Sequence, residues 1–341
     1  MKTARLYRYF IGIDVSKNEL DFAVIEANQV LFHLEVSNNK KGIQLFIKQL
    51  KSQTKATVGN CLFCMEHTGI YCTPLLDYLF SKKANTWVEN AAQIRESTGV
   101  SRTKNDKADA IKIASYAYKN SEDARLWQPK REVILQLDRL TALRNRLVTA
   151  IGMLKKPLKE LALFISKKEV KTTKDCCQAS LLALKKDLKL VDAQIKQVIE
   201  SDLELKQLCK VISSVKGIST TIVTEIIITT NEFKDINNPK KYACYAGVAP
   251  FEHSSGKWRG KAKVSRIANK KVKTLLHMAA LVCIQHCQQT RAYYDRKVGE
   301  GKNKMLIINN IRNKIVLRIF ACVNANRLFE KDFPRTAMVL A

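Results

Sequence analysis

Residues 9–15 read Tyr-Phe-Ile-Gly-Ile-Asp-Val, an apolar run that carries one acid, Asp14, near its end. A short run that is apolar on both faces is typical of a buried β-strand. Two further strand-like runs, 20–26 and 29–36, are separated only by a turn at 27–28. Runs joined by so short a turn are typical of a hairpin. The sequence therefore predicts three consecutive strands in hairpin order.

Strand and helix signals alternate along the rest of the first 125 residues. We expect an amphipathic helix over 41–52, a buried strand over 57–65, a helix over 69–82 with Pro74 in its first turn, a short strand over 86–89 and a helix over 106–119. Glu66 directly follows the strand over 57–65. Three strands in hairpin order, followed by helix, strand, helix and strand, predict an α/β sheet of the RNase H-like (RuvC-like) type.

The middle of the chain, 126–205, is predicted to be a coiled-coil helical hairpin. Apolar residues recur there at alternating spacings of four and three in two separate series. Pro157 is expected to end or kink the first helix, and 167–175 to form the connection. The pattern allows a hairpin that closes within one chain and one that pairs with another protomer.

The remainder, 206–341, is predicted to be a mainly α domain. Residues 215–219, Val-Lys-Gly-Ile-Ser, resemble the turn of a helix-hairpin-helix element. In such a turn, backbone amides and the next helix N-terminus bind a DNA phosphate, so Lys216 and Gly217 are candidate nucleic-acid contacts. Short glycine turns between helices are also common without that role. The predicted domains are thus 1–125, 126–205 and 206–341.

The charge balance points to a polyanionic partner. There are 59 Lys and Arg against 31 Asp and Glu, a formal net charge of +28. Nucleic acid is favoured over an anionic membrane surface, because no apolar run approaches the roughly 18–20 residues of a spanning helix. The N-terminus lacks the apolar core of a signal peptide, and the ten scattered cysteines are typical of reduced thiols. We expect a cytoplasmic, nucleoid-associated protein without a membrane partner.

Four acids form the first candidate site. Asp14 and Glu66 end predicted strands, and Asp106 and Asp109 face the same side of a predicted helix at i, i+3 spacing. Converging carboxylates repel one another, and hard cations such as Mg²⁺ or Mn²⁺ relieve that repulsion. Two such ions stabilise the attacking and leaving oxygens of a phosphoryl transfer. For the second pair of acids, the alternative is a surface helix start that favours negative charge.

Basic residues surround the second acid pair. An acidic metal site beside phosphate-binding cations is what a nuclease cleft requires, although each cation singly also fits a solvated loop. The candidates are Arg95, Arg102, Lys104 and Lys107.

A second candidate site lies at 245–256, Tyr-Ala-Gly-Val-Ala-Pro-Phe-Glu-His-Ser-Ser-Gly. We predict a flexible loop before a helix, well suited to binding a backbone phosphate. Residue pattern alone favours a hydrogen-bonding turn serine, since a serine becomes a nucleophile only when it is activated. The basic residues that follow it are Lys257, Arg259, Lys261, Lys263 and Arg266.

Several motifs together resemble one family. The segments 12–17 (Gly-Ile-Asp-Val-Ser-Lys), 66–69 (Glu-His-Thr-Gly) and 104–110 (Lys-Asn-Asp-Lys-Ala-Asp-Ala) resemble the RuvC-like DEDD domain of the IS110 insertion-sequence transposases, a group that includes Piv-type DNA invertases. The G-x-x-P…S-G pattern from Gly247 to Gly256 resembles the C-terminal motif of the same family, so the likeness spans nearly the whole chain. Further on, 264–269 departs from the family pattern: Val-Ser-Arg replaces an Ile-Ser-Lys-like triplet, and Ala-Asn replaces Gly-Asn.

The resemblance implies a function and assigns roles. It implies that Asp14, Glu66, Asp106 and Asp109 are the catalytic, metal-binding acids, and that Ser255 is a nucleophile that links covalently to DNA, with Ser254 as the alternate. It also implies a structured noncoding guide RNA. The expected protein is a DNA transposase or site-specific recombinase that acts on DNA as a homo-oligomer, a dimer or tetramer.

Three other functions remain open at this stage. The first is a metal-dependent, structure-selective nuclease of the Holliday-junction-resolvase type, without serine chemistry. The second is an actin-like ATPase, for which the second glycine-rich phosphate loop is missing from the sequence. The third is a non-catalytic nucleic-acid-binding protein, against which the four intact acids argue.

Overall fold

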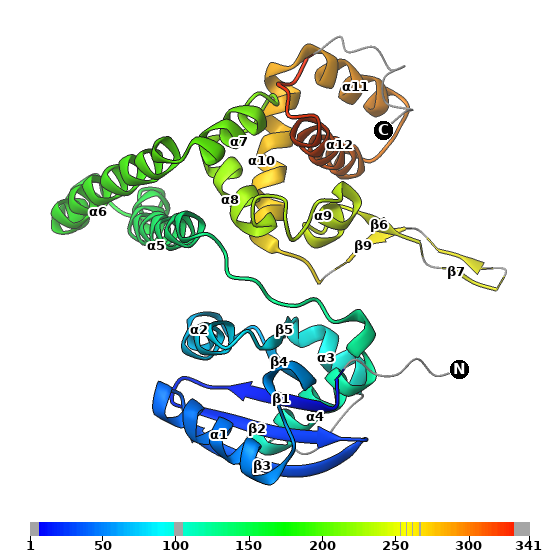
Figure 1. Ribbon diagram of the computed structural model, residues 1–341. Coiled ribbons are helices and arrows are strands. Elements are labelled where there is room, and N and C mark those ends of the chain that lie inside the picture. Colours follow the sequence, from blue (N-terminus) through cyan, green and yellow to red (C-terminus); the bar gives the residue numbers. More distant parts are fainter. Residues whose placement is uncertain are drawn as a thin grey trace. The chain divides into compact units, whose positions relative to one another are not determined.

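The computed structural model describes residues 7–98, 105–252, 254–256, 258–260, 262–265 and 267–330 (Figure 1). Contacts divide the chain into two compact units, Met1–Pro129 and Lys130–Ala341. Each unit is described by itself below. The predicted middle segment belongs to the second unit, because its helices share one hydrophobic core with the helices that follow.

The first unit is built on a five-stranded sheet, in the order β3-β2-β1-β4-β5. Its strands are β1 (Tyr9–Val15), β2 (Glu19–Glu26), β3 (Gln29–Ser37), β4 (Cys61–Glu66) and β5 (Asn85–Glu89). β1, β2 and β3 are antiparallel neighbours, whereas β4 runs parallel to both β1 and β5. The turn between β2 and β3 contains Ala27 and Asn28, both at positive φ, as a two-residue hairpin requires. This topology confirms the predicted RNase H-like α/β sheet.

Helices cover the two faces of this sheet. The helices are α1 (Lys40–Gln53), α2 (Thr73–Ser81), α3 (Ala91–Thr98) and α4 (Asp106–Lys119), with short 3-10 turns at Val58–Asn60, Gly69–Cys72 and Ser121–Asp123. One core lies between the sheet and α1 and α2, and the other between the sheet and α4. Because side chains alternate along a strand, Ile11 and Ile13 of β1 enter the first core, whereas Phe10 enters the second.

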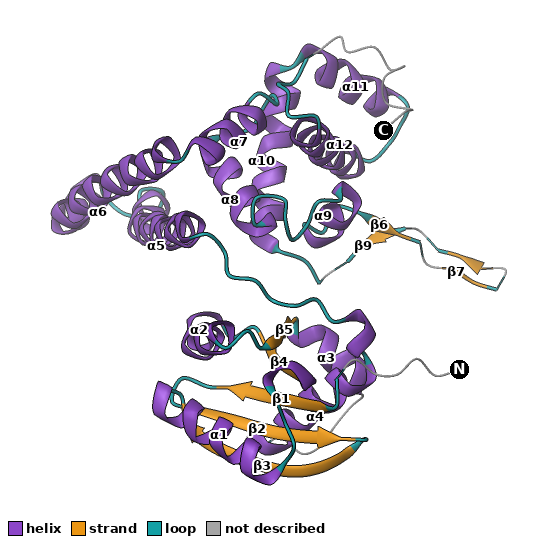
Figure 2. Ribbon diagram, viewed as in Figure 1, coloured by secondary structure: helices purple, strands orange, loops and turns teal. Residues whose placement is uncertain are grey.

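The second unit is mainly helical (Figure 2). Its helices are α5 (Glu132–Leu161), α6 (Lys167–Ser201), α7 (Leu203–Ser213), α8 (Thr220–Thr230), α9 (Pro239–Tyr245), α10 (Lys270–His286), α11 (Gln288–Gly299) and α12 (Lys304–Asn324). The two long helices α5 and α6 form a hairpin, and residues near its base, such as Leu137 and Ile195, join the common core. The other end of the hairpin is exposed.

One guanidinium fastens the base of that hairpin. Arg131 precedes α5 and donates two hydrogen bonds to Asp202, at 2.8 and 3.1 Å. It also bonds Glu232, just beyond α8, whose side chain is only 6% exposed. Asp202 in turn caps α7 by accepting from the Leu205 amide at 2.8 Å. Arg131 therefore ties together the start of α5, the end of α6 and the loop after α8.

Three sequence-based expectations about element boundaries are corrected. The strand predicted from residue 57 begins at Cys61, because the Asn60 side chain accepts from the Thr57 amide at 2.8 Å and supports a 3-10 turn. α5 does not end at Pro157, since a proline removes only one backbone hydrogen bond from this 30-residue helix. The connection predicted over 167–175 is helical, because Ser166 and Glu169 form a capping box that starts α6 at Lys167.

Candidate active site

The sheet places two of the four acids side by side. Asp14 lies near the end of β1 and Glu66 ends β4. These two strands are parallel neighbours, so their carboxyl ends lie at the same edge of the sheet. Alternation along each strand directs both acids to the face that α4 covers, the face on which Phe10 and Cys64 are buried.

The other two acids lie in the first turn of α4. Asn105 caps this helix by accepting from the Ala108 amide at 2.7 Å, so the helix begins at Asp106. Asp109 follows three residues later, still in the first turn. Negative side chains are favourable at a helix N-terminus, which explains why two acids are tolerated there.

A single glycine lets α4 approach the sheet. A Cβ added at Gly12 would lie 2.1 Å from the Ala114 amide nitrogen and 2.2 Å from the Ala110 carbonyl oxygen. Those are backbone atoms of α4, so the helix rests directly on β1 two residues before Asp14. Gly12 therefore sets the distance between Asp14 and the acids of α4.

Burial and neighbouring negative charges perturb Asp14. Burial, followed by the charges of Asp106, Asp109 and Glu66, raises the pKa of Asp14 to about 6. Burial also raises the pKa of Glu66, while the positive charge of Arg95 on α3 opposes that rise. The structure thus brings the four predicted acids into one electrostatic cluster, with one predicted cation beside it.

A divalent metal fits the donor chemistry of this cluster. Carboxylate oxygens are the ligands that Mg²⁺ and Mn²⁺ prefer, and a bound cation would offset the repulsion that raises the pKa of Asp14. The carboxylates are nevertheless not arranged as a metal site: among the described residues, no group of three or more His, Cys, Asp or Glu could hold a metal ion as it stands. The Asp109 carboxylate instead pairs with Lys112 at 2.6 Å.

Two further acids on this face were missed by sequence reasoning. Asp21 of β2 pairs in register with Asp14, is buried and bonds His33 at 2.7 Å. Glu89 of β5 pairs in register with Glu66 and accepts from the Tyr116 hydroxyl at 3.4 Å. Only the strand order makes them neighbours. The one available sequence signal was that each is an acid on the inward face of a predicted strand.

The predicted cations near the acids are described in part. Lys107 is exposed in the first turn of α4, and Arg95 is exposed in the last turn of α3. Arg102 and Lys104 lie outside the described residues.

The serine segment forms a narrow antiparallel ribbon where we predicted a flexible loop. β6 (Pro250–Phe251) pairs with β9 (Lys263–Val264), and β7 (Ser254–Ser255) pairs with β8 (Trp258–Arg259). Gly256 follows Ser255 at a φ of +56°, which suits the first position of a tight hairpin turn. Figure 1 shows this ribbon beyond the end of α9. Ser255 is the last residue of β7.

Contacts at the base of the ribbon hold its two ends together. The backbone N–H of Asn269 donates to the Tyr245 carbonyl at 2.9 Å, and the side-chain amide of Asn269 donates to the Tyr245 hydroxyl at 2.8 Å. Asn269 also caps α10 by accepting from the Val272 amide at 3.0 Å. At Gly247, φ is +63°, and an added Cβ would lie 2.5 Å from the Ala268 Cβ. Gly247 and Asn269 thus have structural roles at the base of the ribbon.

Of the predicted cations in this segment, Arg259 on β8 and Lys263 on β9 are exposed. His253, Lys257, Lys261 and Arg266 lie outside the described residues. The four acids belong to the first unit, and Ser255 belongs to the second.

The predicted helix-hairpin-helix turn joins α7 to α8. Gly217 has a φ of +83°, and an added Cβ would lie 2.8 Å from the Ala279 carbonyl oxygen of α10. The Lys216 carbonyl accepts from the Cys283 thiol at 2.9 Å, so the turn is packed on α10. Ser219 starts α8 without a side-chain cap, and a cavity of about 370 Å³ at that helix start is also lined by Arg144 and Lys196.

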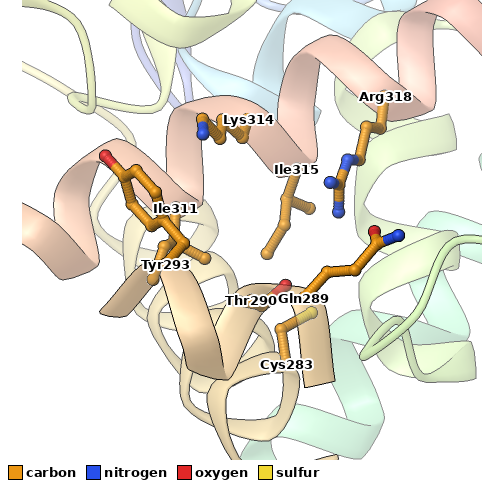
Figure 3. Close-up of a pocket in the computed structure, with 8 residues that line it drawn as sticks. All are labelled: Cys283, Gln289, Thr290, Tyr293, Ile311, Lys314, Ile315 and Arg318. Carbon is orange, nitrogen blue, oxygen red and sulfur yellow. The ribbon is translucent and has the colours of Figure 1, made fainter. Parts of the chain in front are cut away.

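A smaller cavity lies between α10, α11 and α12 (Figure 3). It measures about 50 Å³ and is lined by Cys283, Gln289, Thr290, Tyr293, Ile311, Lys314, Ile315 and Arg318. Lys314 lies over the Tyr293 ring, with its ammonium 3.9 Å from the centroid. A cavity of this size has room for a few water molecules and is far below the roughly 300–1,000 Å³ of a typical small-molecule pocket. It is therefore excluded as a nucleotide site.

Comparison with known families identifies the class of protein. The DEDD transposase family model for IS110 elements, described as a transposase, matches residues 11–165. The model described as "Transposase IS116/IS110/IS902 family" matches residues 209–295. Together the two segments make up well over half of the chain and contain all four acids and Ser255. The chain belongs to the IS110 family of transposases, as the sequence motifs predicted.

Individual relatives agree with this assignment. The pilin gene-inverting protein of Moraxella bovis is 27% identical over 94% of this chain and 98% of its own length, and that of Moraxella lacunata is equally similar. An insertion element IS110 protein of Streptomyces coelicolor is 24% identical over 46% of this chain and 38% of its own length. Among solved structures, T. thermophilus RuvC in complex with a Holliday junction substrate covers 36% of this chain and 100% of its own, at 11% identity and a TM-score of 0.29.

Within the part of the chain that the structure describes, no helix is long and apolar enough to cross a membrane.

Proposed function

We propose that this transposase cleaves and rejoins DNA with a metal-binding acidic tetrad and a nucleophilic serine. The observation that carries the proposal is the placement of Asp14 and Glu66 at the ends of neighbouring parallel strands, on the sheet face that α4 covers. Asp106 and Asp109 in the first turn of α4 lie close enough for their charges to raise the pKa of Asp14. Membership of a transposase family makes DNA the expected substrate of that cluster.

The four acids would hold Mg²⁺ or Mn²⁺, which supplies charge stabilisation for the leaving oxygen at the scissile phosphate. Gathering the carboxylates around a cation requires Asp109 to leave its ion pair with Lys112. Arg95, already close enough to Glu66 to influence its pKa, would bind the phosphate. Lys107 and the undescribed Arg102 and Lys104 complete the proposed phosphate contacts.

Ser255 would act as the nucleophile. Its oxygen forms a bond to phosphorus, the bond from phosphorus to the leaving DNA oxygen breaks, and the serine proton passes to a base as the bond forms. The resulting phosphoserine conserves the bond energy for rejoining. The tight turn at Gly256 exposes Ser255 near the end of the ribbon, which favours access to a DNA strand. In this proposal the acids and Ser255 meet as a composite site.

Several groups would bind the nucleic-acid backbone away from the chemistry. Arg259 and Lys263 lie on the serine ribbon. Further proposed contacts, outside the described residues, are Lys257, Lys261 and Arg266. The uncapped start of α8, beside Lys216 and Gly217, offers backbone amides to a phosphate. A net charge of +28 is large enough to serve both DNA and a structured guide RNA. We place such a protein in the cytoplasm with the nucleoid.

The helical hairpin would pair with another copy as a coiled coil. Its connection exposes Leu163 and Phe164, which are 79% and 85% accessible. Large apolar side chains so exposed are typical of a surface that is covered in an assembly. A dimer or tetramer is therefore part of the proposal.

The decisive experiment traps a covalent protein–DNA adduct. The full chain is incubated with Mg²⁺, RNA transcribed from the noncoding sequence that flanks its own gene and labelled DNA from the same flanks, and the adduct is detected on a denaturing gel. We expect an adduct from the unaltered protein, none from Ser255→Ala or Asp14→Asn, and an adduct from the matched control Ser254→Ala. Loss with Ser254→Ala alone would move the nucleophile to Ser254. DNA cleavage that survives Ser255→Ala would support the alternative, a Holliday-junction-resolvase-like nuclease.

A further inference from the structure

An exposed tryptophan lies directly across the ribbon from Ser255. Ser255 pairs with Trp258, and Ser254 pairs with Arg259, in an antiparallel register. Residues that face each other in such a pair have their side chains on the same side of the ribbon, with Cβ atoms about 4.5–5.5 Å apart. One face therefore carries Ser255 with Trp258, and the other carries Ser254 with Arg259.

Trp258 is 64% exposed, and it makes no ring-stacking or cation–π contact within the described residues. The other two tryptophans differ: Trp87 is buried in the first unit, and Trp127 lies edge-on against Phe80. A large aromatic surface left in water on a two-stranded ribbon contributes nothing to a core and is available for contact with a ligand.

The setting favours a nucleic-acid base as that ligand. Arg259, on the opposite face of the same two-stranded ribbon, is exposed and positive, and Lys263 of β9 is also exposed. An aromatic ring on which bases stack, together with cations that bind the backbone, is the combination by which proteins hold single strands. A stack of this kind requires an unpaired base, because bases inside a duplex already stack on their neighbours.

We propose that Trp258 is a stacking platform for an unpaired DNA base next to the phosphate that Ser255 attacks. The inference rests on the proposed function, because it takes Ser255 as the nucleophile. Since the two side chains share a face, a base stacked on the indole holds its own backbone phosphate beside the serine hydroxyl. Trp258 is thus a positioning residue, and the face it defines selects Ser255 over Ser254.

The first test measures stacking without requiring catalysis. The probes are a single-stranded dT₁₂ and an abasic 12-mer that has the same backbone charge and no bases. Trp258 fluorescence is isolated as the difference between the unaltered protein and Trp258→Phe. We expect dT₁₂ to quench this signal and the abasic strand to leave it unchanged. Trp258→Ala should weaken dT₁₂ binding about 5- to 150-fold, as the loss of one stacked base predicts, and leave abasic binding unchanged.

Controls separate stacking from charge, folding and chemistry. Trp258→Phe should retain most of the affinity for dT₁₂, because phenylalanine also stacks. Equal quenching by the abasic strand, or equal weakening of both probes in Trp258→Ala, would overturn the proposal. Quenching by rU₁₂ with none by dT₁₂ would also overturn it, by assigning the platform to RNA.

The second test links stacking to the serine. Trp258→Ala should slow adduct formation at least tenfold, and Trp258→Phe should restore most of the rate. Ser255→Ala should form no adduct and still show dT₁₂ quenching. Quenching without any adduct in the unaltered protein would reject the serine mechanism and leave the platform standing. Normal adduct formation by Trp258→Ala would reject the link to Ser255 attack and leave the serine mechanism standing.

Discussion

Replacing Gly12 with alanine should displace α4 and disable the acid cluster. The new Cβ would lie 2.1 Å from the Ala114 amide nitrogen, whereas ordinary contact begins at 3.4 Å. Both clashing groups are backbone, so no side-chain rotation relieves the contact, and the helix must move by about 1.3 Å, the difference between those distances. Overpacking of this kind costs about 1–3 kcal/mol of stability.

The functional loss should exceed the loss of stability. Asp106 and Asp109 move with α4, whereas Asp14 stays with β1, so the metal ligands separate. A misplacement of about 1 Å at a catalytic site costs on the order of 100-fold in rate. The assay is adduct formation at a temperature where circular dichroism shows the variant folded, together with Mn²⁺ affinity by calorimetry.

A matched control exists in the same unit. An added Cβ at Gly59 meets nothing within 4 Å, so Gly59→Ala should leave stability, Mn²⁺ affinity and adduct yield unchanged. If Gly12→Ala matched Gly59→Ala in all three measurements, α4 would not rest on β1 as described, and the account of how the acids are positioned would be refuted.

Three other perturbations test separate parts of the structure. Asp14→Asn should stabilise the metal-free protein at pH 7.5 by about 1 kcal/mol, because the raised pKa of Asp14 in the folded state means that its ionisation opposes folding; the full effect of at most about 3 kcal/mol is reduced by solvent screening. Thermal melts should show this gain in stability vanish as the pH falls from about 6 to below 3.8. Arg131→Ala should lower the free energy of unfolding in urea by about 3 kcal/mol, because it removes the guanidinium that pairs with the buried Glu232 side chain. Arg139→Ala, which breaks an exposed ion pair with Glu132 in α5, should lower it by less than about 1 kcal/mol; equal losses would contradict the structural role of Arg131. Asn269→Ala should lose about 1 kcal/mol with the α10 cap and lower the adduct yield, whereas Tyr245→Phe keeps the cap, removes the hydroxyl contact and should lower the adduct yield alone. An unchanged yield in both would show that the base of the ribbon does not position Ser255.

Strong local patterns explain why much of the first unit was predictable. The alternating and apolar runs of β1, β2 and β3, with a turn at Ala27 and Asn28, specify a hairpin-ordered sheet on their own. The family motifs then located the four acids. The coupling of those acids depends on Gly12, whose close approach to α4 is a packing fact that no spacing along the chain reveals.

Other features depended on contacts that the sequence does not display. Asp21 and Glu89 join the acidic face only because β2 and β5 flank β1 and β4 in the sheet. The serine ribbon pairs through strands of two residues, too short for any periodic signal, and is held by the contact of Tyr245 with Asn269. By contrast, the start of α6 could have been predicted in place of a connection, since Ser166 and Glu169 have the spacing of a capping box.

The ion pairs of Arg131 have a mechanical consequence. Arg131 joins the start of α5 to Asp202 and Glu232, and the hairpin base also packs in the common core. The exposed tip at Leu163 and Phe164 is therefore connected through this base to the unit that carries the serine ribbon. Arg131→Ala would loosen that connection without altering the tip or the ribbon.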